Sequence, residues 1–227
     1  MTRRHAFTLI ELLVVIGLIA VLAGGLGLAL SDKGSRASAL QSGQYTINSL
    51  LSGARARAAL KQTNARIFVN STISSEGFLR EFYIATFNGT KWVVTGDPVL
   101  LPSGIYLVPL GPTGTKFPSS EVDLAPEEGG AWPVNYSSNA IADSSGGTTL
   151  QLVAGTDLTG AVYREVQTIN TRGTLSNTGT IGQRIVLSGG EVIGGTQIKF
   201  TKPEFVRGLR ISNYGVASLI NEATGFD

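Results

Sequence analysis

Residues 3–30 read RRHAFTLIELLVVIGLIAVLAGGLGLAL, and they decide how the rest of the chain is placed. From Phe7 onward this stretch has 24 residues with one charge, Glu11, and no proline. A helix rises about 1.5 Å per residue, so residues 7–30 would extend roughly 36 Å, enough to cross a hydrocarbon core of about 30 Å. Arg3 and Arg4 precede this predicted transmembrane helix. The positive-inside rule therefore predicts a cytoplasmic N-terminus and an exported remainder.

Three interpretations of this stretch compete. A cleaved secretory signal has a shorter apolar region, of about 7 to 15 residues, and does not explain an acid close to the basic cluster. A plain membrane anchor explains the length but leaves Glu11 unpaired near the bilayer, at a cost of about 2.5 kcal/mol or more. A cut between Ala6 and Phe7 explains the acid, because the new α-amino group would lie one helical turn before Glu11. In a stack of helices, this amine can neutralise the glutamate of a neighbouring subunit, and a buried pair of this kind sets register.

Residues 3–16 resemble the prepilin-type cleavage and methylation motif of type IV pilins and type II secretion pseudopilins. The likeness covers the basic leader, the small residue Ala6 before the cut, Phe7 after it and a glutamate, Glu11, at the fifth mature position. It implies that a prepilin peptidase removes residues 1–6 and methylates the amine of Phe7, and that Glu11 sets assembly register. The family usually has Gly at the position of Ala6.

The same resemblance implies where the protein resides and what it contacts. It predicts a single-pass protein of the inner membrane whose head lies in the periplasm or on a surface filament. The implied partners are the prepilin peptidase, other pilin or pseudopilin subunits and the inner-membrane assembly platform.

The composition excludes several kinds of enzyme chemistry. Cysteine is absent and His5 is the only histidine, so disulfides, thiol nucleophiles and Cys/His zinc sites are excluded, as is a histidine base once residues 1–6 are removed. Charged residues make up 15% of the chain, against about 25% in an average soluble protein, and 29 residues are glycine. The net charge of +2 equals the contribution of Arg3 and Arg4, so it gives no argument for nucleic-acid binding. We expect a non-enzymatic protein without a cofactor.

Residues 31–63 are predicted to form an amphipathic stem helix. Its apolar residues recur at intervals of 7, 4, 3 and 4, which places them on one face of a 3.6-residue helix. They are Leu40, Ile47, Leu51, Ala54 and Ala58. The stem region is also basic, with Arg36, Arg55, Arg57, Lys61 and Arg66. These charges fit a solvated face attracted to anionic headgroups, pairing with acids of neighbouring subunits, or DNA binding; the last is disfavoured because no aromatic residues interleave with them.

Residues 64–227 are predicted to form an antiparallel β-rich head, which makes the fold class α+β. Strand patterns occur at residues 66–70, 78–87, 91–94, 161–169, 180–187, 205–212 and 216–220. Asn88-Gly89 between the second and third patterns is a signal for a two-residue hairpin loop. Seven of the eight prolines fall between Asp97 and Pro133. We therefore expect residues 97–160 to form a loop-rich insert at the surface.

The order of elements in the head is similar to that of pseudopilin H of type II secretion and its FimT-like pilus relatives. We expect a minor structural subunit, because the long proline-rich insert suits contact with a partner better than close lateral packing. The alternative function is that of a minor pilin that binds a ligand. The ligand would be either DNA, during uptake, or an exported substrate. Arg207 and Arg210 are the candidate DNA contacts, but their odd spacing places them on opposite faces of a regular strand.

An acidic group in the insert is a candidate calcium site, because hard cations prefer several carboxylate oxygens. Its members are Glu121, Asp123, Glu127 and Glu128. The chain lacks an Asp-x-Asp-x-Asp-Gly loop, so solvated loop charge is the favoured interpretation and no metal site is assigned.

Overall fold

The computed structural model describes residues 9–109, 121–130, 132–138, 150, 158, 162–175 and 183–226. Within these ranges, the side chains of residues 11, 21–34 and 134 lie outside the description. The chain divides into two compact units, Met1–Ser38 and Ala39–Asp227.

The helix α1 spans Leu9–Lys61 and contributes residues to both units. In the second unit, the stripe of Leu40, Ile47, Leu51, Ala54 and Ala58 is buried, with no member more than 4% exposed. This confirms the face that the sequence periodicity predicts. The helix ends where Gln62 adopts a left-handed conformation, with φ of 52°, a common way for helices to end.

A mostly sequential antiparallel sheet forms one half of the head. Its strands are β1 (Ala65–Asn70), β2 (Glu81–Phe87), β3 (Trp92–Val94), β4 (Val99–Leu100) and β7 (Tyr163–Ile169). The order is β3-β2-β1-β7, and β4 also pairs with β2. Strands β1 and β7 are far apart in the sequence, and β7 pairs with the edge of β1 that β2 leaves free.

A second antiparallel sheet has the order β12-β11-β8-β5. Its strands are β5 (Ile105–Leu107), β8 (Gln183–Gly189), β11 (Val206–Ile211) and β12 (Ala217–Ile220). A small third sheet contains β6 (Val122–Asp123), β9 (Glu191–Ile193) and β10 (Gln197–Lys199), and its β6–β10 pair is parallel. Two short 3-10 helices complete the described elements, η1 (Val134–Tyr136) and η2 (Ala223–Phe226). The structure thus confirms an α+β fold with antiparallel sheets.

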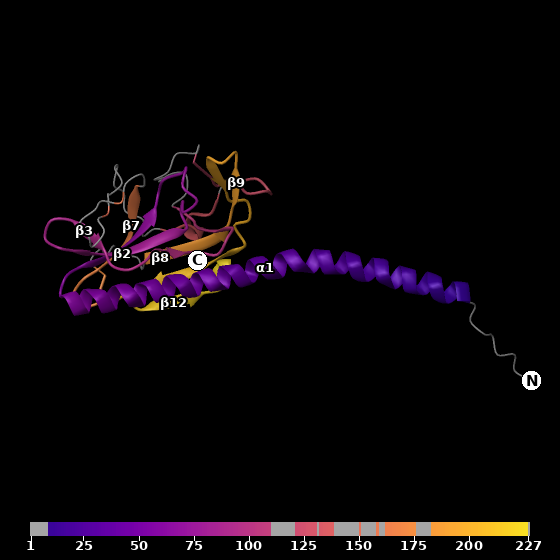
Figure 1. Ribbon diagram of the computed structural model, residues 1–227, viewed down its shortest axis with the longest axis horizontal. Helices are drawn as coiled ribbons and strands as arrows, with labels where there is room; N and C mark the ends of the chain where they lie inside the picture. Colours follow the sequence, from indigo (N-terminus) through magenta and orange to yellow (C-terminus); the bar gives the residue numbers. More distant parts are fainter. Residues whose placement is uncertain are drawn as a thin grey trace, which may run out of the picture. The chain divides into compact units, whose positions relative to one another are not determined.

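The main core lies between the second part of α1 and the two larger sheets, which run beside it in Figure 1. A Cβ atom added at Gly43 would lie 3.3 Å from the Leu187 side chain of β8, and one at Gly53 would lie 3.4 Å from the Ile84 side chain of β2. The helix therefore approaches both sheets closely at its glycines. A smaller cluster that includes Phe68 and Tyr83 packs separately from this core.

The structure differs from the predicted strands most clearly at the start of β2 and at the loop that follows it. Residues 78–80 form a turn, and β2 begins at Glu81 because Leu79 adopts a left-handed conformation, with φ of 54°. The expected two-residue loop at Asn88-Gly89 is wrong, since pairing begins at Phe87 with Trp92 and leaves four residues in the loop. The carbonyl oxygen of the Asn88 side chain accepts hydrogen bonds from the backbone N–H groups of Thr90 and Lys91, which removes them from the ladder.

The segment 97–160 is not entirely a surface excursion. Its described part contains only short strands, as the prolines predict, but β5 pairs with β8 and is buried. Leu101 and Trp132 are also buried, at 1% and 2% exposure. A proline ends a strand but does not keep its neighbours from the core, so short buried pieces alternate with loops here.

Candidate functional site

The predicted processing site lies at the edge of the described chain. The described residues begin at Leu9, so Arg3, Arg4, Ala6 and Phe7 lie outside them. The backbone of Glu11 lies in the first turn of α1, and its side chain is outside the description. The cleavage, methylation and register roles of these residues therefore stay predictions.

The first turns of α1 carry apolar side chains that are exposed on every side. Exposure ranges from 84% at Leu9 to 46% at Val15. The set, which we call the apolar collar, comprises Leu9, Ile10, Leu12, Leu13, Val14, Val15, Ile16, Leu18 and Ile19. Successive residues turn by about 100° around a helix, so the apolar side chains of the collar point in all directions around α1. A helix of this kind is stable only when surrounded by apolar material, in a protein core or in a membrane.

Among the described residues, no helix is both long enough and apolar enough to cross a membrane. Within the predicted span 7–30, residues 7 and 8 and the side chains of residues 11 and 21–30 fall outside the description. The transmembrane segment thus stays a prediction.

Three basic residues of the stem region, Arg55, Lys61 and Arg66, contact residues of the head. The Arg66 guanidinium lies 2.9 Å from Glu165 Oε2, and its Cζ lies 4.2 Å from the centroid of the Trp92 ring. Lys61 Nζ donates a hydrogen bond to Thr86 Oγ1 at 3.4 Å. Burial lowers the pKa of Arg57. The aromatic partner of Arg66 comes from β3, so inspection of neighbouring sequence positions could not reveal it.

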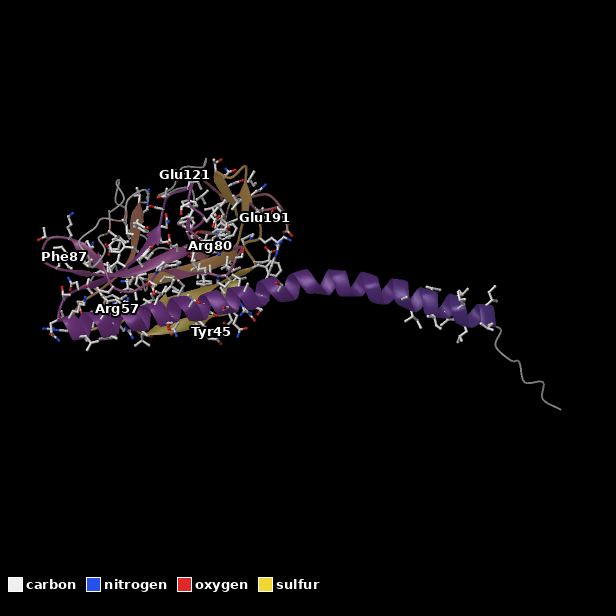
Figure 2. The ribbon with its side chains drawn as sticks, in the orientation of Figure 1. Tyr45, Arg57, Arg80, Phe87, Glu121 and Glu191 are labelled. Atoms are coloured by element: carbon white, nitrogen blue, oxygen red, sulfur yellow. The ribbon has the colours of Figure 1, made fainter. Side chains whose placement is uncertain are left out.

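The acidic group predicted as a possible calcium site begins at Glu121, just before β6, and continues through Asp123 of β6 to the turn after it. Glu127 lies 3.5 Å from Lys202 Nζ, and both side chains are largely exposed. Figure 2 labels Glu121 away from Phe87. Asp123 and Glu191 lie on the two outer strands of the third sheet, each paired with Lys199 of β10. Within the described ranges, no group of three or more histidine, cysteine, aspartate or glutamate side chains is placed to hold a metal ion.

Arg207 and Arg210 lie on β11, whose register with β8 is unbroken. Arg207 pairs with Leu187 and Arg210 with Arg184, so the two arginines point to opposite faces, as their spacing predicts. Burial, and then the charge of Arg210, lowers the pKa of Arg184. The guanidinium of Arg210 also donates to the backbone carbonyl of Phe226 at 3.3 Å. Arg207 and Arg210 therefore do not form one basic face.

A polar residue that the sequence analysis missed is buried in the stem. Gln44 is 1% exposed, and its side-chain nitrogen donates to the carbonyl oxygens of Gly208 at 2.7 Å and Ile220 at 3.0 Å. The available signal was its position, four residues after Leu40 and three before Ile47, which places a polar side chain within the apolar stripe.

Comparison with known proteins bears on the N-terminus. Residues 1–27 match the family model of the prokaryotic N-terminal methylation motif. No curated protein and no solved structure matches the chain. The motif implies processing by a prepilin peptidase and assembly with other pilin subunits. The match, together with the apolar collar that follows it, supports a type IV prepilin-like protein.

Proposed function

We propose that this chain is a non-enzymatic structural subunit, of the minor kind, in a type II secretion or type IV pilus-like filament. The observation that carries the proposal is the apolar collar, which begins at the third residue after the predicted cut and lies within the matched motif. Exposure of an apolar surface of this extent to water is unfavourable in free energy. Its burial among other subunits, or in a membrane, therefore stabilises the filament or the membrane-inserted state.

In this proposal, the precursor inserts in the inner membrane with Arg3 and Arg4 in the cytoplasm. The prepilin peptidase then cuts after Ala6 and methylates the amine of Phe7. The apolar helix packs among those of other subunits, and Glu11 pairs with the amine of a neighbour. The head contributes surface contacts in the periplasm or on the filament.

The test is the intact mass and N-terminal sequence of the native protein extracted from membranes. We expect a chain that starts at Phe7 and carries one added methyl group. A mature chain that starts at Met1, or at a residue beyond Leu30, would contradict the proposal, because neither product exposes an amine one turn before Glu11.

A further inference from the structure

The contact between the stem and the head is mostly apolar. The buried face of α1 in the second unit consists of aliphatic and small residues, which pack against strands of both large sheets. Apolar contacts are non-directional. A core whose total volume is kept tolerates repacking, and it loses its unique structure before it loses stability. Such a face can hold a helix firmly without defining its axial position.

Gln44 differs from the rest of this face in both chemistry and geometry. Among the described residues of α1 it is the only buried polar side chain. Its two acceptors belong to residues that are register partners in the β11–β12 hairpin, Gly208 and Ile220. A hydrogen bond needs a defined distance and angle, so two bonds from one amide define a single position of α1 along the hairpin.

Gln44 is also incompletely satisfied. In the described part of the chain, its Oε1 atom is buried without a hydrogen-bond partner. The amide cannot be turned round, because that would direct the oxygen at the two carbonyl groups. A half-satisfied buried amide adds little to the free energy of unfolding. The role of Gln44 is therefore something other than stabilisation.

Gly43 restricts the helix at the same level. A Cβ atom there would lie 3.3 Å from Leu187 and 3.4 Å from Ile105, so a larger residue would need the sheet to give way. A slide of one turn that brings Ile47 to this place would therefore meet β8 and β5. Gly43 excludes some positions by shape, while Gln44 selects one by hydrogen bonding.

We propose that Gln44 is a positioning residue that fixes the axial register of the stem helix on the final hairpin, and that it does so without adding net stability. This inference does not depend on the filament function. A buried polar residue that fixes helix register is known from coiled coils, where it lowers stability.

The test uses the absence of cysteine from the full chain, which allows spin labels to be placed at will. Ser218 on β12 is exposed, and the contacts Gln44–Ile220 and Arg55–Tyr214 lie on either side of it along the helix. One label is placed on the helix, at Ser42→Cys or at Ala59→Cys, and the second at Ser218→Cys. The two helix positions lie on opposite sides of the level of Ser218 along α1. Sliding of α1 shortens one of the two distances and lengthens the other.

Distances are measured by double electron–electron resonance on the full chain in detergent. We expect one narrow distance for each pair with Gln44. In Gln44→Met we expect a second distance, from a slide of up to one turn, about 5 Å, that moves Ala39 rather than Ile47 toward the place of Gly43. This slide shortens the distance from Ser42 to Ser218 and lengthens the distance from Ala59 to Ser218. The thermal midpoint of Gln44→Met should be equal to or above that of the parent. The control Leu40→Met changes an apolar residue of the same face and should keep single distances.

Two outcomes overturn the inference. Unchanged single distances in Gln44→Met would show that packing alone sets the register. Loss of folded structure in Gln44→Met, under conditions where Leu40→Met stays folded, would show that Gln44 stabilises the head rather than positioning the helix.

Discussion

Glu11 is the residue on which the assembly mechanism depends, because it is the one charge in residues 7–30. We expect Glu11→Ala to leave cleavage and methylation intact, since the cut site itself is unchanged. Assembly should fall by far more than tenfold, because a buried amine without its partner costs about 3–5 kcal/mol. Incorporation is measured by immunoblot of sheared filaments, with Leu12→Val as the matched apolar control. Incorporation of Glu11→Ala at the level of Leu12→Val would contradict the register role.

Gly208 is the residue at which the second sheet least tolerates a side chain. A Cβ atom at this position would fall on the backbone carbonyl oxygen of Ile185 in the neighbouring strand β8. Because backbone must move to make room, we expect Gly208→Ala to lower the free energy of unfolding by about 1–3 kcal/mol. Chemical denaturation checks this, with Gly189→Ala on β8 as the control, since its nearest contact would be Gly104 O at 3.8 Å. Equal stability of the two variants would show that β11 can shift.

At the scale of elements, the first sheet holds a pair of buried tyrosines on β2 and β7. The rings of Tyr83 and Tyr163 meet edge to face, with centroids 5.3 Å apart, and the Tyr83 hydroxyl donates to Glu81 Oε1 at 3.2 Å. Burial, and then the charge of Glu81, raises the pKa of both phenols. Since the folded pKa lies above the unfolded value near 10, the unfolded chain loses these protons first as the pH rises. The stability of the sheet is therefore fully present below about pH 10 and declines above it.

Tyr83→Phe should reduce this alkaline loss of stability. At pH 7 the variant should be about 1 kcal/mol less stable, because the hydrogen bond to Glu81 is lost. Between about pH 10 and 11 the difference from the parent should shrink. Urea midpoints across this range measure the effect, and Tyr214→Phe, at a tyrosine 79% exposed, is the control. A constant difference at all pH values would argue against ionisation of Tyr83 in unfolding.

At the scale of the whole molecule, the proposed role predicts how many copies enter a filament. The segment between β3 and β7 holds seven of the eight prolines, and its described part has only short strands. Such a segment suits contact with a particular partner better than repeated close lateral packing. We expect quantitative mass spectrometry of purified filaments to find far fewer copies of this chain than of the main subunit. A stoichiometry equal to that of the main subunit would overturn the minor role and leave the processing mechanism unaffected.

The sequence by itself determined the features that depend on local pattern. Helical periodicity identified the buried stripe from Leu40 to Ala58, and the matched motif identified the N-terminal processing signal. The antiparallel hairpins β2–β3 and β11–β12 followed from strand patterns beside glycine turns. These features are recognisable because residues within one turn or one hairpin interact with near neighbours in sequence.

Only the tertiary structure decided the contacts between distant segments. It brought Gln44 to acceptors 164 and 176 residues away, placed Arg66 against Trp92, and moved β5 from the predicted surface insert into the second sheet. Sequence periodicity does not predict these contacts. Each one depends on how the whole core packs and not on the neighbouring residues in the sequence. Local periodicity therefore shows which face of α1 is buried, while its axial position depends on a hydrogen bond to the other end of the chain.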